Sequence, residues 1–69
     1  MATITLTDKD GIRFDINAES ITAVEPLGPL ASLAFKARSR VTIDGIKSVF
    51  VKEEDFDVMT KVVMGVMQP

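Results

Sequence analysis

Alternating apolar and polar residues mark two strands near the N-terminus. Residues 3 to 7 read Thr-Ile-Thr-Leu-Thr and residues 12 to 16 read Ile-Arg-Phe-Asp-Ile, the period of two that is typical of half-buried strands. The residues between them, Asp8-Lys9-Asp10-Gly11, favour a turn because Asp accepts backbone hydrogen bonds and glycine tolerates positive φ. We therefore predict a first hairpin whose inward-facing side chains are Ile4, Leu6, Ile12, Phe14 and Ile16.

A bend, a third strand and a loop are expected next. Asn17-Ala18-Glu19-Ser20 resembles a short bend, and residues 21 to 25 form a strand that Pro26 ends, since proline removes a backbone donor. Residues 26 to 32 hold two of the three prolines of the chain. We expect regular structure to lapse there and the segment to be a mobile loop.

The second hairpin is predicted to be longer and to carry a basic face. From residue 33 to residue 43 the even positions include Lys36, Arg38 and Arg40, and alternate residues of a strand project from the same face. Asp44-Gly45 then predicts a two-residue type I′ turn into a strand at residues 46 to 52, because that turn needs two residues with positive φ.

Counting outward from this turn gives the expected register of the second hairpin. It pairs Ile43 with Ile46, Arg40 with Val49 and Arg38 with Val51, so the basic face would also carry two valines. A sheet with apolar residues on both faces needs two covers. Since the chain supplies one helix, we expect a second subunit to provide the other.

A helix is predicted from about residue 54 to residue 67, with acidic residues at its positive N-terminal end. At 100° per residue its apolar side chains fill an arc of about 180°, wider than the roughly 100° that packing on one sheet requires. Gly65 is a candidate for an earlier end of this helix. We expect part of the arc to reach a neighbouring subunit, with an oligomer interface made of Val49, Val51, Met59, Val62 and Val66.

Together these elements predict an α+β fold in one domain spanning residues 1 to 69. The expected architecture is a strongly bent antiparallel sheet of four to five strands, formed by two hairpins and a linking strand, with one C-terminal helix. The chain is short, and a domain of this size buries only about 60% of its unfolded surface. Self-association is therefore an early expectation.

Composition excludes several kinds of chemistry. The 69 residues include no His and no Cys, so the chain lacks an imidazole base, a thiolate nucleophile and the usual zinc ligands. We expect no enzyme activity, no cofactor and no metal. Asp8, Asp10 and Gly11 are interpreted as a turn rather than a calcium loop, because the later calcium ligands are missing. Since no leader pattern and no run of 18 apolar residues occurs, we expect a cytoplasmic protein without a membrane segment.

Charge is segregated along the chain. Residues 1 to 25 carry two basic and five acidic groups, residues 26 to 52 carry five and one, and residues 53 to 69 carry one and four. The basic middle makes four residues the candidate partner- or ligand-binding site: Lys36, Arg38, Arg40 and Lys47. A solvated or intersubunit face is the alternative interpretation. All four phenylalanines fit core positions, which argues against a nucleic-acid platform.

Three short motifs are spread over most of the chain: a hairpin turn at Asp10-Gly11, the bend Asn17-Ala18-Glu19 with Ile21, and the segment Gly45, Lys47 and Val51-Lys52-Glu53 before the terminal helix. In these motifs the chain resembles the FlbD (SwrD) family of small flagellar-operon proteins, and similar small phage-encoded proteins. It implies a strand-rich body with one helix and brings no catalytic residues. Asp10 stands where the family has Asn, and residues 26 to 40 form a longer segment than the family has.

From the sequence we favour a non-enzymatic interaction or adaptor protein. It would act as a homo-oligomer through the apolar helix face and the basic hairpin, with itself and another protein as partners. One alternative is a phage-type inhibitor or sequestering protein that binds a small anionic, nucleotide-like ligand or a defence protein. The second alternative is nucleic-acid binding through the basic hairpin.

Overall fold

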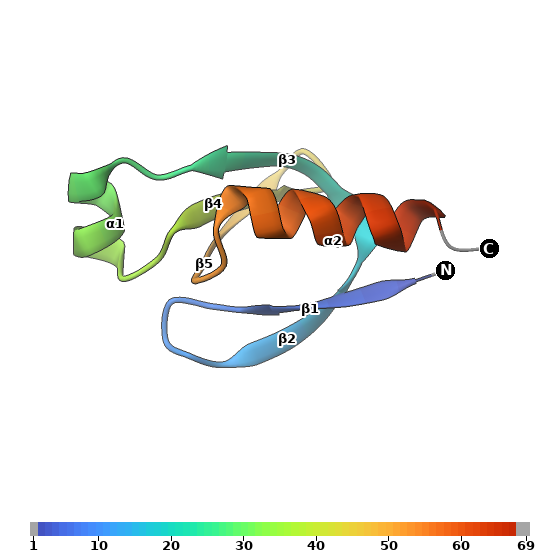
Figure 1. Ribbon diagram of the computed structural model, residues 1–69, viewed down its shortest axis with the longest axis horizontal. Coiled ribbons are helices and arrows are strands. Elements are labelled where there is room, and N and C mark those ends of the chain that lie inside the picture. The colour runs from blue at the N-terminus through green and yellow to red at the C-terminus, as the bar shows by residue number, and fades with distance from the viewer. Residues whose placement is uncertain (1, 68–69) are drawn as a thin grey trace.

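The computed structural model describes residues 2–67 and has an α+β fold, as predicted (Figure 1). The first half contains β1 (Thr3–Thr7), β2 (Arg13–Asn17), the 3-10 helix η1 (Ala18–Ser20) and β3 (Ile21–Pro26). The second half contains α1 (Pro29–Phe35), β4 (Ser39–Ile43), β5 (Lys47–Val51) and α2 (Asp55–Met67). All strand pairs are antiparallel, and they form a β1-β2 sheet and a β3-β4-β5 sheet.

The first hairpin follows the predicted turn chemistry. One carboxylate oxygen of Asp8 accepts hydrogen bonds from the backbone N–H groups of Asp10 and Ile12, at 2.9 and 3.0 Å, and Gly11 has a φ of +83°. Ile4 and Leu6 point into the core. Ile12 differs from the prediction, because it precedes β2 and is exposed rather than inward-facing.

A short helix replaces the first part of the predicted long strand. Residues 29 to 35 form α1, so β4 begins only at Ser39. Pro29 occupies the first turn of α1, where its fixed φ favours a helix and its missing N–H is not needed. Lys36 ends the helix with a φ of 54°, and its N–H bonds to the carbonyl of Ser32. The predicted loop at residues 26 to 32 therefore contains regular structure except at residues 27 and 28.

The register of the β4-β5 hairpin differs from the prediction by one residue. Asp44 and Gly45 have the expected positive φ values of 53° and 71°. The ladder nevertheless pairs Ile43 with Lys47, Arg40 with Phe50 and Ser39 with Val51. A one-residue shift moves every side chain of a strand to the opposite face. Val51 therefore faces the core, where its burial stabilises this register, and Phe50 takes its place beside the basic side chains.

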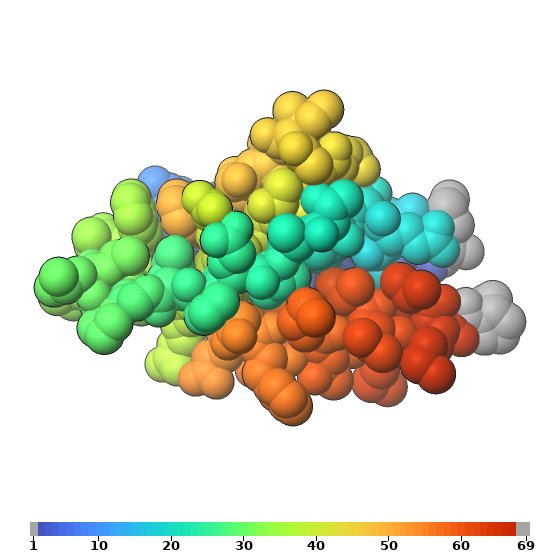
Figure 2. All heavy atoms as spheres, turned by 90° about the horizontal axis from the view of Figure 1, so that it is seen from above, coloured from blue at the N-terminus to red at the C-terminus, as the bar shows by residue number. Residues whose placement is uncertain are grey.

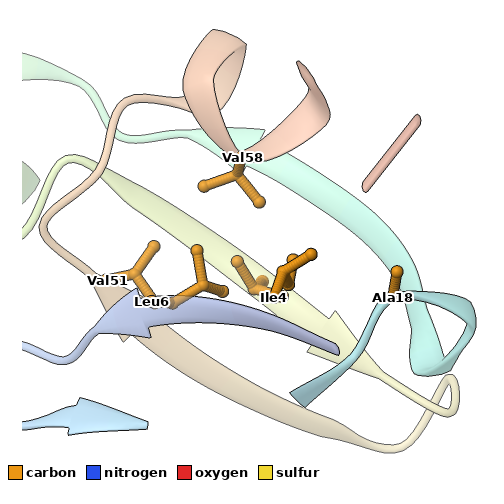
Figure 3. Close-up of a cluster of buried hydrophobic side chains, with 6 residues drawn as sticks. Ile4, Leu6, Ala18, Val51 and Val58 are labelled. Carbon is orange, nitrogen blue, oxygen red and sulfur yellow. The ribbon is translucent and has the colours of Figure 1, made fainter. Parts of the chain in front are cut away.

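The two sheets meet at one end, and α2 closes the opening between them. Lys52 donates its backbone N–H to the carbonyl of Thr7 at 2.8 Å, and Asp8 and Val51 form an isolated bridge. In Figure 1, α2 runs along the long axis of the molecule between β3 and β1, and it packs on η1, β3 and β1. The buried core lies between these layers and consists of Ile4, Leu6, Ala18, Val41, Val51 and Val58. Figure 3 labels five of these side chains, which come from both sheets, η1 and α2: Ile4, Leu6, Ala18, Val51 and Val58.

Gly65 does not end the helix, which continues to Met67. It lies buried where α2 crosses η1, and a Cβ built on it would come within 2.7 Å of the Ala18 Cβ. The glycine therefore permits a close approach of the helix to η1. Among the described residues, no helix is long and apolar enough to cross a membrane.

Candidate interaction surface

The side of α2 that faces away from the core is almost entirely apolar. Val58 and Val62 pack on the core, and at about 100° per residue the remaining apolar side chains project from the other side of the helix. Their exposed fractions lie between 49% and 77%, and we call this set the outer face of α2: Phe56, Met59, Val63, Met64, Val66 and Met67. The space-filling view from above places α2 along one margin of the molecule (Figure 2). The wide predicted arc therefore becomes exposed apolar surface.

A shallow hollow on this face is lined by Phe56, Met59, Thr60, Val63 and Met64. Thr60 is its one polar side chain, and its hydroxyl donates to the carbonyl of Phe56 at 2.9 Å. The hollow therefore presents apolar carbon and an internally bonded hydroxyl. Such a surface offers little that would orient a polar ligand.

The residues of the predicted oligomer interface fall into three groups by their exposure. Met59 and Val66 belong to the outer face of α2, whereas Val62 and Val49 are partly buried against the core. Val51 has no exposed surface, so its assignment to an interface is wrong. The shifted register of β5 turned this side chain into the core of its own chain.

Phe56 is a surface residue that the sequence reasoning placed in the core. Its side chain is 74% exposed at the first turn of α2. The signal for this was present in the sequence, because an apolar arc of about 180° leaves about half of its residues beyond the stripe that a sheet covers.

The four predicted basic residues do not gather on one face. Lys36 ends α1, and Lys47 is exposed at the start of β5. Arg38 forms an ion pair with Glu54 at 2.8 Å, and Arg40 forms one with Glu25 at 2.7 Å. Both guanidinium groups therefore already have carboxylate partners.

A second, larger hollow lies between α1, the end of β5 and the start of α2, and its charges are mixed. Lys36, Arg38 and Lys52 line it together with Glu53, Glu54 and Asp57. Lys52 donates its ammonium to the carbonyl of Lys36 at 3.1 Å. Glu53 accepts the backbone N–H of Thr7 at 2.9 Å. With three cations beside three carboxylates, the hollow has no excess positive charge to attract an anion.

Two phenylalanines stack beside the hairpin. The rings of Phe35 and Phe50 lie with centroids 4.5 Å apart and planes 7° apart, which anchors the end of α1 on β5. The sequence placed both in the core, but Phe35 is exposed and Phe50 is partly exposed. The pair is best explained as packing between these two elements.

Within residues 2–67, no group of acidic side chains is arranged to hold a metal ion. Comparison of the chain with protein-family models, with curated proteins and with solved structures finds no match. The resemblance to the FlbD (SwrD) family stays a prediction.

Proposed function

We propose that the chain is a non-enzymatic interaction protein that self-associates through the outer face of α2. The observation that carries this proposal is the exposure of six apolar side chains on one helix, with no charged residue among them. At their exposed fractions they offer on the order of 600 Å² of apolar surface per chain. A contiguous apolar patch of that size lies at the upper end of what monomers expose, and such patches commonly mark interaction sites.

The physical argument concerns α2 as a whole. The apolar face of a helix is normally buried, but the sheets and η1 cover only the part of the apolar arc of α2 that carries Val58 and Val62, and the outer face of α2 stays exposed. A second copy supplies a cover of matching size and chemistry, because it presents the same uncharged surface. The buried area falls at the lower end of specific interfaces, so the oligomer should be in exchange with its monomer.

The basic residues contribute less to this proposal than the sequence suggested. Arg38 and Arg40 are in ion pairs, and the hollow beside α1 contains as many carboxylates as cations. These observations give no particular support to an anionic ligand or to nucleic acid. The proposal therefore rests on the helix alone.

Sedimentation equilibrium of two matched variants tests the proposal. Val63→Lys places a charge in the outer face of α2, and Ile46→Lys makes the same kind of change at a side chain that is 90% exposed on the β4-β5 turn. We expect Val63→Lys to raise the dissociation constant of the oligomer at least about tenfold, since 1.4 kcal/mol corresponds to tenfold, and Ile46→Lys to leave it unchanged.

Circular dichroism would verify that both variants are folded. We expect Val63→Lys to keep its helix, because Lys is a better helix former than Val. A wild-type protein that stays monomeric up to about 1 mM, the weak end of measurable affinities, would refute self-association. Equal effects of the two variants would show that the outer face of α2 is not the contact.

A further inference from the structure

Four residues of the outer face of α2 follow the spacing of a helix-pairing seam. Phe56, Met59, Val63 and Val66 are separated by three, four and three positions, which is the alternation of two apolar positions in a heptad. All four are about half exposed or more. The stripe therefore presents one continuous line of side chains to a facing helix.

We propose that a second copy docks on this stripe in the antiparallel orientation, with the two-fold axis near residue 61. This inference rests on the proposed function and adds the orientation and register of the contact. It pairs Met59 with Val63 of the partner subunit, and Phe56 with Val66 of the partner subunit. The same pairs recur on the other side of the axis because a two-fold contact is isologous.

Side-chain volume favours the antiparallel orientation. In this register each large residue of the stripe lies opposite a valine, so the layers along the interface have similar volumes. A parallel pair would place Phe56 opposite Phe56 of the partner subunit and Val63 opposite Val63 of the partner subunit. Layers that alternate between overfilled and underfilled pack poorly.

Charge favours the same orientation. Four acidic residues lie in the first turn of α2 or directly before it: Glu53, Glu54, Asp55 and Asp57. The described end of the helix, from Val62 to Met67, carries no charged residue. A parallel pair would bring the two acidic groups together. In the antiparallel pair they lie roughly 20 Å apart, the length of 13 helical residues, which is more than twice the Debye length of about 8 Å at physiological salt. The antiparallel pair also places the positive N-terminal end of each helix dipole beside the negative C-terminal end of the other, which is favourable.

Single-cysteine variants test the orientation, because the chain has no cysteine of its own. Met59→Cys and Val63→Cys would be oxidised separately and as an equal mixture, and the products would be weighed by mass spectrometry. Antiparallel docking brings residue 59 level with residue 63 of the partner. It offsets two copies of residue 59 by about 6 Å along the axis, from 1.5 Å per residue, beyond the reach of a disulfide.

We expect the mixed disulfide to exceed either symmetrical disulfide about tenfold, because only residues 59 and 63 of different copies lie within disulfide reach. Ile46→Cys is the control, and we expect it to give no disulfide in excess. Symmetrical disulfides from each variant alone would overturn the antiparallel orientation and leave self-association standing. A wild-type protein that is monomeric by sedimentation would overturn both. Phe56→Cys mixed with Val66→Cys provides a second pair with the same expectation, should either first variant fail to fold.

Discussion

Replacing Gly65 with alanine tests the close packing of α2 on η1. In an exposed helix this change would stabilise the protein by about 1 kcal/mol, because alanine is the better helix former. Here the added Cβ would lie 2.7 Å from the Ala18 Cβ and 3.3 Å from the Ile4 Cγ2. Carbon atoms prefer a separation of about 3.5 to 4.0 Å, so α2 and η1 would have to move apart by about 1 Å.

The cost of this movement should exceed the gain in helix propensity. The Ala18 Cβ is attached directly to the backbone and has no rotamer that relieves the contact. Overpacking of a buried site costs roughly 1 to 3 kcal/mol, and a 2.7 Å contact with a Cβ that cannot rotate away belongs in the upper part of that range, at about 2 to 3 kcal/mol. After the gain of about 1 kcal/mol in helix propensity is subtracted, we expect Gly65→Ala to lower the free energy of unfolding by about 1 to 2 kcal/mol. For a domain of this size that loss corresponds to a Tm decrease of roughly 5 to 15 °C.

The matched control is the same change in an Ala18→Gly background. Removing the opposing Cβ relieves the 2.7 Å contact and leaves the Ile4 Cγ2 at 3.3 Å as the tightest one, a distance that a small side-chain shift relieves. Gly65→Ala should there become neutral or stabilising by up to about 1 kcal/mol. Urea unfolding followed by circular dichroism at one protein concentration would measure all four proteins, because self-association makes stability depend on concentration. A Gly65→Ala protein as stable as the wild type, or an identical effect in both backgrounds, would refute the proposed packing.

Two further predictions concern the buried ends of β4 and β5. Val51→Asp should unfold the chain, because a carboxylate at this fully buried position costs at least roughly 4 kcal/mol. Circular dichroism would detect the unfolding, and a folded variant would contradict the observed register. Ser39→Ala should lower the free energy of unfolding by about 1 to 3 kcal/mol in urea titrations, since the buried Ser39 hydroxyl donates to the Glu53 carbonyl at 2.7 Å. The exposed Ser48→Ala is its control, and equal effects would count against that hydrogen bond.

The parts of the fold that depend on local chemistry could be predicted from the sequence. The turns at Asp8 to Gly11 and at Asp44-Gly45 were identified because Asp and Gly satisfy specific backbone requirements. The bend after β2 was also found, and there the side chain of Asn17 accepts the N–H of Glu19. The terminal helix followed from its periodicity and its acidic start.

The predictions that were wrong concern features that depend on contacts between residues far apart in the sequence. The register of β5 was counted from an ideal two-residue turn, but burial of Val51 in the core fixes a three-residue connection between Ile43 and Lys47. The apolar and polar residues of α1 fit a strand as well as a helix over so short a length, and Pro29 and the stack of Phe35 on Phe50 decide between them.

The sequence predicts that the candidate surface exists but not which residues form it. The width of the apolar arc on α2 indicated that part of it would stay uncovered, and this follows from the sequence alone. Which residues are uncovered depends on the direction from which the core approaches the helix. Phe56 was therefore assigned to the core although it is among the most exposed side chains of α2.

An isotope-filtered nuclear Overhauser measurement tests the central claim, that a second copy covers the outer face of α2, most directly. Equal amounts of labelled and unlabelled protein would be mixed, so that only contacts between different copies are detected. We predict such contacts between Met59 and Val63 and between Phe56 and Val66, and none from Ile46. Intermolecular contacts that involve only other surfaces, or none at concentrations near 1 mM, where an interface of millimolar affinity is populated, would contradict the account.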